Sequence, residues 1–295
     1  MIDEATAPPA AGTPSGRDRW RTRGLAALAV AVFIAGGFAV SRRMEPVAAP
    51  TAIPSSQSST ALSTAPSPVA PSTSPPAPST KPSRSTGTTV SAGVLQLPGA
   101  VPARGSGRFA YASGRGAVAG GQGQLRRFRV AVEIGSNEDV KAFAEQVAGT
   151  LGDPRSWTGG GRLRLQRVGG ADPAEFTVYL ATRDTAGKMC LRGGTNIRVG
   201  GRPYTSCRTT GKAIINLDRW RLSAPPYVRA KVALSTYRQY VINHEVGHEL
   251  GHHHQGCPRA GGPAPVMVQQ TLTLRGCKAY AWPRLNGKAF TGPSL

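Results

Sequence analysis

The five histidines of this chain all lie within eleven residues, in the stretch HEVGHELGHHH. His244 and His248 are four residues apart, so on an α-helix their imidazoles lie on one face and can bind the same metal ion. Glu245 follows His244 and lies about 100° further around the helix, which puts its carboxylate beside the ion rather than among its ligands. This arrangement predicts a zinc site with a carboxylate that takes a proton from bound water.

A third ligand must come from the chain beyond that helix. Gly251 tolerates the left-handed conformation in which helices end, so the chain can turn there and return His254 to the ion. No Asp or Glu occurs between residue 250 and the last residue, which excludes a downstream carboxylate ligand. Three protein ligands leave the fourth position open, as in catalytic zinc sites. The alternatives to His254 as third ligand are His252, His253 and Cys257.

The pattern H-E-x-x-H-x-x-G-x-x-H resembles the zinc-binding signature of the metzincin metallopeptidases. Over residues 93–283, the chain also resembles a family of actinobacterial, membrane-anchored, uncharacterised metzincin-like domains. The resemblance implies one catalytic zinc ion held by His244, His248 and His254, with Glu245 as general base. It further implies an α+β or α/β fold in which a mixed sheet has an edge strand, a backing helix and an active-site helix.

Metzincins also carry a methionine in a tight turn beneath the metal. Met267 follows His254 by thirteen residues, after two glycines and in the run Pro-Ala-Pro-Val-Met, which is typical of a turn. We expect it to be this Met-turn; the alternative is ordinary core packing. Some metzincins have a tyrosine two residues after the methionine, whereas this chain has Gln269. Tyr280 lies further along and either serves instead or packs as an ordinary aromatic.

The hydrophobic pattern predicts the elements that position these residues. We expect strands at Arg127–Ile134, Arg162–Val168, Ala174–Thr182 and Lys212–Asn216. A first helix is expected at Glu138–Leu151, with two acidic residues in its first turn. A last, long helix should begin after two prolines near Val228, break before Tyr237 and end near Gly251. In metzincins the strand before that helix is an edge strand that pairs with extended substrate, so the resemblance gives this role to Ala213, Ile214 and Ile215.

The N-terminal residues predict a membrane anchor. Residues 1–23 form a polar tail with four arginines, and residues 24–40 have no charge and would span about 25 Å as a helix. Because two arginines follow directly and no clean cleavage site is present, we expect an uncleaved signal anchor. The arginine asymmetry places the tail in the cytoplasm and the remainder outside. A cleaved signal, which would make the protein secreted, is the alternative.

Beyond the anchor, composition divides the chain into two further parts. Residues 41–92 are rich in Pro, Ser and Thr, and they predict a disordered linker because they offer little apolar surface to bury. Residues 93–295 are enough for one domain with a sizeable core. All four cysteines lie in this last part, which predicts two disulfides in an exported protein. Of the three pairings, we favour Cys190–Cys207 and Cys257–Cys277.

The formal net charge is +21, yet no nucleic-acid-binding motif accompanies it. We therefore expect no nucleic acid partner; the charge either solvates the surface or meets anionic wall polymers and lipid headgroups. The motifs together predict a membrane-anchored, extracytoplasmic zinc metalloendopeptidase, a monomer acting on peptide or protein substrates of the cell wall or its surroundings. Two alternatives stay open. One is a non-catalytic cell-wall-binding module stabilised by zinc, and the other is a zinc amidase acting on peptidoglycan peptides.

Overall fold

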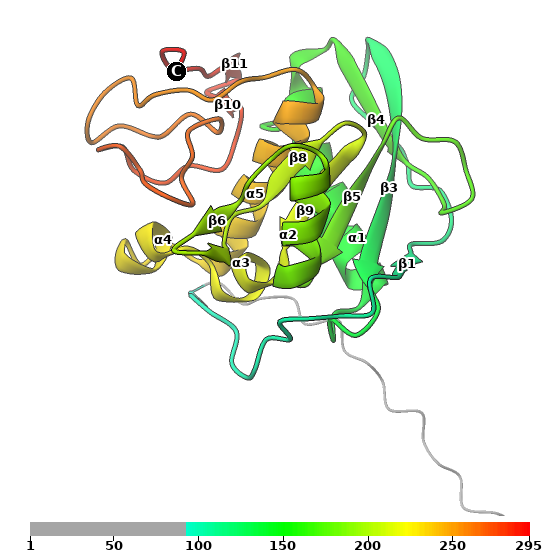
Figure 1. Ribbon diagram of the computed structural model, residues 1–295. Coiled ribbons are helices and arrows are strands. Elements are labelled where there is room, and N and C mark those ends of the chain that lie inside the picture. Colours follow the sequence, from blue (N-terminus) through cyan, green and yellow to red (C-terminus); the bar gives the residue numbers. More distant parts are fainter. Residues whose placement is uncertain (1–92) are drawn as a thin grey trace, which may run out of the picture. The chain divides into compact units, whose positions relative to one another are not determined.

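The structure is a computed structural model, and it describes residues 93–295 (Figure 1). The predicted cytoplasmic tail (1–23), signal anchor (24–40) and linker (41–92) lie outside the described residues. Among residues 93–295, no helix combines the length and the apolar character needed to cross a membrane.

A mixed seven-stranded sheet forms the centre of the domain, as the α+β prediction required. Its strand order is β2-β4-β3-β5-β9-β8, and β1 pairs with β3. The strands are β1 Phe109–Tyr111, β2 Val118–Ala119, β3 Gln124–Glu133, β4 Leu163–Arg167, β5 Phe176–Ala181, β8 Cys207–Thr209 and β9 Lys212–Asn216. The four central strands, β4, β3, β5 and β9, run parallel, whereas β1, β2 and β8 pair antiparallel with their neighbours.

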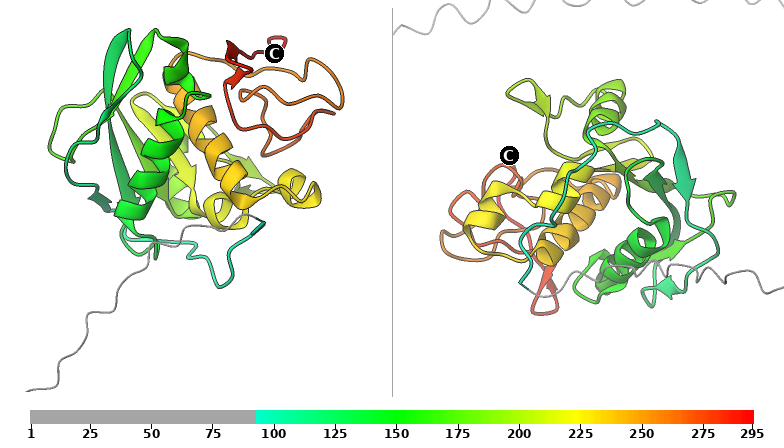
Figure 2. Two further views of the ribbon diagram at one scale, coloured as in Figure 1. Left: turned by 180° about the vertical axis from the view of Figure 1, so that it is seen from behind. Right: turned by 90° about the horizontal axis from the view of Figure 1, so that it is seen from below.

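Helices cover both faces of the sheet. The helices are α1 Val140–Gly152, α2 Arg183–Arg192, α3 Leu217–Leu222, α4 Pro225–Arg229 and α5 Leu234–Glu249, with a 3-10 turn, η1, at Trp157–Gly160. Figure 2 shows α1 and α5 on one face, and Figure 1 shows α2 on the other. Along β3, Phe128, Val130 and Val132 point to the face with α1 and α5 and are buried in the main core there. Asp139 caps α1 by accepting a hydrogen bond from the Ala142 amide.

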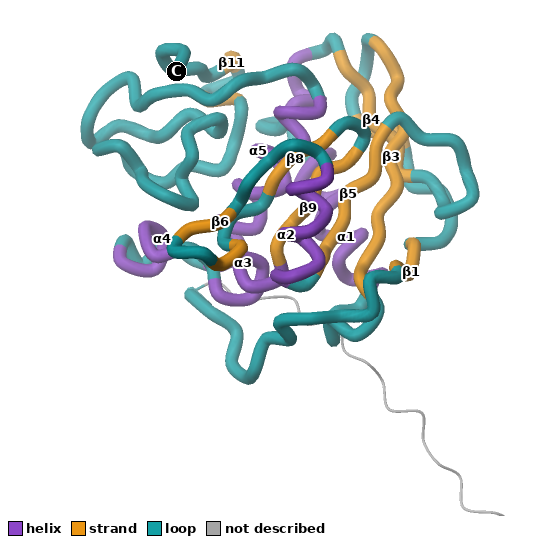
Figure 3. Tube along the Cα trace, viewed as in Figure 1, coloured by secondary structure: helices purple, strands orange, loops and turns teal. Residues whose placement is uncertain are grey.

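Beyond α5 the chain forms a long segment of turns and loops, shown in teal in Figure 3. Two small hairpins stand apart from the main sheet: β6 Arg198–Val199 with β7 Arg202–Pro203, and β10 Arg284–Leu285 with β11 Lys288–Ala289. Both predicted disulfides are present. Cys190–Cys207 joins α2 to β8, and Cys257–Cys277 closes the loop segment after α5. The second disulfide belongs to a small buried cluster of its own, where regular secondary structure is absent.

The prediction that Lys212–Asn216 forms an edge strand is wrong. β9 lies between β5 and β8, and Ala213, Ile214 and Ile215 are 0% exposed. A substrate peptide therefore cannot reach them, and the edge strand is β8. The sequence did not indicate β8 because this strand has three residues, too few for an alternating pattern. The chain turns directly from β8 into β9 at Gly211, whose φ is +73°.

The other predicted elements are present with shifted ends. The break that was expected before Tyr237 falls between α4, which ends at Arg229, and α5, which begins at Leu234. Helix α2 was not predicted, because its sequence is mostly polar and it buries only Ala186, Gly187 and Cys190. It packs over the second, smaller core of the domain, on the sheet face opposite α5.

Candidate metal centre

Helix α5 carries the first two histidines and ends as the sequence predicts. Gly251 adopts a φ of +91° and donates its amide hydrogen to the His248 carbonyl at 3.1 Å. The His252 amide donates to the Gly247 carbonyl at 3.0 Å. These two bonds form a Schellman motif, which satisfies carbonyls at the helix end and reverses the chain. The reversal brings the next residues back toward the helix face that carries His244.

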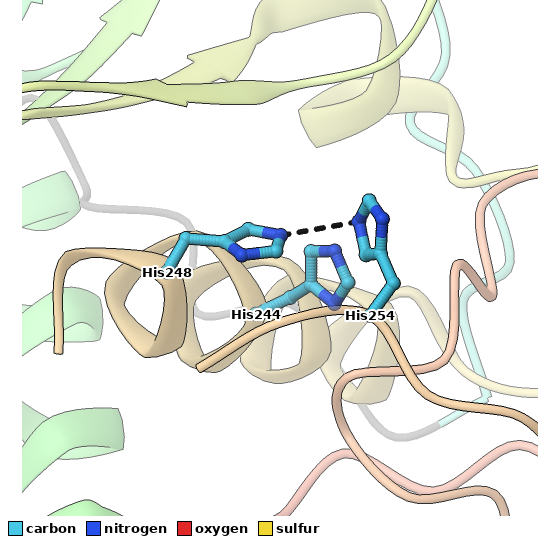
Figure 4. A group of neighbouring side chains, drawn as sticks. All are labelled: His244, His248 and His254. Atoms are coloured by element: carbon cyan, nitrogen blue, oxygen red, sulfur yellow. Dashed lines mark hydrogen bonds between the residues drawn. The ribbon is translucent and has the colours of Figure 1, made fainter. Parts of the chain in front are cut away.

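Figure 4 shows that His244, His248 and His254 point toward one another. One ligand nitrogen from each lies within 4.8 Å of the others. The Nε2 atoms of His248 and His254 are 3.1 Å apart. Two nitrogens bound to one tetrahedral zinc at 2.0–2.1 Å would be about 3.3 Å apart. The nitrogens of His248 and His254 therefore have nearly the spacing that zinc requires, and the third nitrogen, from His244, lies within 4.8 Å of both.

The outer nitrogens of two of these rings are fixed by backbone carbonyls. His244 Nδ1 lies 2.8 Å from the Val266 carbonyl oxygen, and His248 Nδ1 lies 2.8 Å from that of His252. Because a carbonyl oxygen only accepts, each Nδ1 carries the hydrogen and donates it. The lone pair of each ring is then on Nε2, which faces the cluster. Such bonds orient metal-binding histidines and increase their basicity.

The histidines of the cluster resist protonation. Burial, followed by the nearby His248, lowers the pKa of His244 to about 3. Burial and the nearby His248 likewise lower the pKa of His254 to about 4, and burial lowers the pKa of His248. Neutral imidazoles at neutral pH are the form that binds metal ions. The three imidazoles therefore carry no positive charge that would repel a cation at neutral pH.

Glu245 is the buried acid of the site. It is 5% exposed, and its side chain lines the same cleft as the three histidines. Burial raises the pKa of Glu245 to about 8, because a carboxylate is costly in an apolar setting without a cation. A carboxyl group with a pKa near neutrality can both accept and return a proton.

The other candidate third ligands lie elsewhere. The His252 ring stacks on Trp157, with ring centroids 4.3 Å apart, and does not join the cluster. His253 is exposed, and Cys257 is bonded to Cys277. Of the alternatives that the sequence left open, only His254 reaches the other two histidines.

Met267 lies beneath the cluster in a tight turn. The Val268 amide donates to the Pro265 carbonyl at 3.0 Å, which closes the turn, and Met267 is 1% exposed. Its sulfur packs against Gly247, where an added Cβ would lie only 2.6 Å from Sδ and 2.7 Å from the ring of Trp157. The close approach of the turn to α5 therefore requires glycine between the two helical histidines. The sequence pattern alone does not indicate this packing role of Gly247.

The histidines and Glu245 lie in a cleft of about 490 Å³. Residues 195–199 and the edge strand β8 form one wall, and Gln269, Thr271 and Leu272 contribute to the other. Arg208 of β8 pairs with Glu249 of α5 at 2.8 Å, which ties the edge strand to the helix that carries His244 and His248. His248 and His254 are half-buried, so two members of the histidine cluster are accessible from this cleft.

Two tyrosines near the site have different roles. Tyr240, four residues before His244, lines the cleft, donates to the Val268 carbonyl at 3.1 Å and accepts from the Gln270 amide at 2.9 Å. Its helical spacing from His244 was the signal that could have found it. Tyr280 does not line the cleft, and its hydroxyl donates to the Arg284 carbonyl at 2.7 Å. Tyr280 is thus a packing residue, the second of its two predicted roles.

The fold and the site together define a class: a disulfide-bonded α+β domain whose cleft combines three histidines with a buried glutamate. The chain belongs to the family described as "Protein of unknown function (DUF3152)", whose model matches residues 96–286. No curated protein and no solved structure matches the chain significantly.

Proposed function

We propose that residues 93–295 form a zinc-dependent endopeptidase of the metzincin type. One observation carries the proposal: three neutral imidazoles and one buried carboxyl group converge in a single open cleft. The turn at Met267 beneath the cluster and the helix end at Gly251 support the metzincin assignment, as does a mixed sheet with an antiparallel edge strand.

The three histidines are the proposed metal ligands. When bound, zinc supplies Lewis acidity, which polarises a scissile carbonyl and lowers the pKa of a bound water. His244 and His248 hold their lone pairs toward the ion because Val266 and His252 fix their outer nitrogens. The third ligand, His254, would come from the chain after Gly251, and a set of three protein ligands would leave the fourth position to water or substrate.

Glu245 is the proposed general base. It removes a proton from the attacking water and later gives that proton to the leaving amine. A structural zinc site has no use for such a carboxyl group, and burying one is costly. The retention of Glu245 in the cleft therefore favours catalysis over the non-catalytic wall-binding module.

The proposed substrate is an extended peptide that pairs with β8. Among the strands of residues 93–295, β8 pairs with β9 alone, and its Cys207 and Arg208 line the cleft. A free strand edge offers backbone donors and acceptors to an incoming chain, and pairing gives affinity with little sequence requirement. The role first expected of Ala213, Ile214 and Ile215 thus moves to the neighbouring strand.

We further propose that the domain works outside the cytoplasm, held by the segment at residues 24–40. The two disulfides support this location, because disulfides persist in oxidising compartments. In this setting peptide or protein substrates near the membrane or the wall are within reach of a linker of about 50 residues.

A cleavage assay with the full chain tests the proposal. The purified protein, with zinc, is incubated with a broad peptide library and with peptidoglycan stem peptides, and cut sites are identified by mass spectrometry. We expect internal cleavage that EDTA abolishes and that Glu245→Ala reduces by about 10²–10⁴-fold while zinc binding is kept. Cleavage of stem peptides alone would favour the amidase, and zinc binding without any cleavage would favour the binding module.

A further inference from the structure

A second groove lies on the opposite side of the sheet from α1 and α5, between α2, β1 and β5. Its volume is about 310 Å³, and it shares no lining residue with the metal-site cleft. Lys188 and Arg192, four residues apart on α2, are exposed along one side. Phe109 of β1 and Tyr179 of β5 line the other side. The groove therefore combines cationic and aromatic walls.

The aromatic wall continues beyond the groove as a row of three rings. The centroids of Phe109 and Tyr179 are 4.9 Å apart, and those of Tyr179 and Tyr111 are 6.4 Å apart. Tyr111 is 39% exposed, so its ring is open to solvent. The guanidinium of Arg129 lies 5.9 Å from the centre of the Tyr111 ring, so a cation stands at this end as well.

The carboxylates near the groove, within residues 93–295, do not pair with these cations. Glu133, beneath the groove, is 1% exposed and accepts four hydrogen bonds, from the amides of Gly107 and Thr182 and the hydroxyls of Thr182 and Thr185. The neighbouring Asp184 is paired with Arg104 at 2.9 Å. Within residues 93–295, neither Lys188 nor Arg192 forms a salt bridge. Their charges are available to a ligand.

We propose that this aromatic–cationic groove binds an anionic polysaccharide. Tyrosine and phenylalanine rings give flat apolar surfaces on which sugar rings pack, and the tyrosine hydroxyls add a polar edge. Lysine and arginine on α2 pair with carboxylate or phosphate groups carried by the sugars. A row of rings with cations at both ends suits a long, regularly charged chain better than a small molecule.

A polysaccharide fits better than a nucleic acid, although both are anionic polymers that can stack on aromatic rings. The disulfide at Cys190 lies in the same helix as Lys188 and Arg192. Disulfides persist in oxidising compartments, so this choice between the two polymers rests on the extracytoplasmic location proposed above. The proposal does not depend on the peptidase activity, because the two sites share no residues.

The test compares two charge-reversed variants of the full chain that have the same net charge. Lys188→Glu/Arg192→Glu changes the groove, and Arg229→Glu/Lys231→Glu changes exposed residues at and just after α4. Binding is measured by affinity electrophoresis in gels that contain polygalacturonate or neutral dextran. We expect polygalacturonate binding by the wild type, loss of about tenfold or more in affinity for the groove variant, and little change for the control. Equal loss in both variants would mean a non-specific effect of net charge and would overturn the proposal.

The aromatic contribution is tested at Tyr111. Tyr111→Ala should weaken polygalacturonate binding, whereas Tyr111→Phe, which keeps the ring, should retain most of it. Circular dichroism checks that each variant is folded, and cleavage activity should stay at the wild-type level in all of them. An oligothymidylate is also added as a competitor of polygalacturonate binding. If it displaces the protein as effectively as free polygalacturonate does, the ligand is a nucleic acid and the choice of a polysaccharide is overturned.

Discussion

His244 donates a hydrogen bond from Nδ1 to the backbone carbonyl of Val266 at 2.8 Å. Val266 immediately precedes Met267, so the turn beneath the cluster also sets the orientation of the first proposed ligand. The same turn is held by Tyr240, whose hydroxyl bonds the Val268 carbonyl at 3.1 Å. Helix α5 and the turn thus fix each other through contacts at residues 240, 244 and 247, and a change in one should be felt in the metal affinity of the other.

The first prediction concerns this contact. Gly247→Ala introduces a Cβ 2.6 Å from Met267 Sδ and 2.7 Å from Trp157, so the turn must move away from the helix. We expect a loss of about 1–3 kcal/mol in stability and weaker zinc binding. Gly149→Ala in α1 is the matched control, because a Cβ there meets nothing within 4 Å. Helix propensity should make that variant neutral or slightly more stable. Thermal unfolding and zinc titration measure both.

The second prediction distinguishes neighbouring histidines. His254→Ala should lose most of the bound zinc, because it removes one of three clustered nitrogens. His252→Ala removes only a ring stacked on Trp157, since its backbone carbonyl still accepts from His248. That variant should keep one zinc per chain by elemental analysis. An equal loss of zinc in His252→Ala would show that the metal is held by a different set.

The third prediction is the acid sensitivity of the metal-free protein. The folded-state pKa values of His244 and His254 are about 3 and about 4, whereas a free histidine titrates near 6.5. At these two positions the unfolded chain therefore binds more protons below pH 6.5. Together the two histidines outweigh the opposite contribution of Glu245, so stability falls as the pH decreases from about 6.5 toward 4. Urea unfolding in EDTA measures this loss. His244→Asn should reduce the slope, and His253→Asn, at an exposed position, should leave it unchanged.

The fourth prediction concerns Glu245, whose contribution to stability changes with pH in the opposite direction. The pKa of Glu245 is raised from 4.5 to about 8, so the folded metal-free protein binds more protons than the unfolded chain between these values. Glu245 therefore costs stability that grows as the pH rises through this window. In EDTA at pH 8, Glu245→Gln should be more stable than the wild type by roughly 2–4 kcal/mol, with the difference vanishing near pH 4. Glu145→Gln, at an exposed position on α1, should show no such gain.

The fifth prediction concerns the disulfides. The bonded cysteines are 17 residues apart in Cys190–Cys207 and 20 apart in Cys257–Cys277, and loops of this size are worth about 3 kcal/mol each on the chain-entropy model. The paired change of Cys257 and Cys277 to serine should lower the melting temperature and also weaken zinc binding, because the bond closes the segment between His254 and the Met267 turn. An unchanged zinc affinity in that variant would show that the segment holds its place without the bond.

Much of the candidate site could be predicted because its spacing is local. The four-residue interval places His244 and His248 on one face of a helix. Gly251 ends that helix with a φ of +91°, a conformation that favours glycine. The number of cysteines predicted two disulfides, and the favoured one of the three possible pairings is the one present. Contacts between distant segments could not be predicted: nothing in the sequence indicates that Val266 accepts from His244, or that Gly247 makes room for Met267.

The sheet order shows the same limit. The pattern of apolar residues predicted strands where β3 and β5 lie, yet it gave no order for the sheet and could not tell whether β9 had one neighbour or two. That depended on Cys207–Thr209, whose three residues are too few to show any period. Helix α2 was not predicted for a related reason. It is mostly polar and buries small residues, so its sequence shows little hydrophobic periodicity.

The disulfide between Cys190 and Cys207 gives that short strand a further property. A three-residue edge strand has few backbone hydrogen bonds and, alone, would fray and re-form continually. Its covalent link to α2 removes this motion when the protein first oxidises. A peptide that docks on β8, as proposed above, would then meet a strand that is already ordered. The entropy of ordering the strand would be lost once, when the disulfide forms, rather than at every binding event.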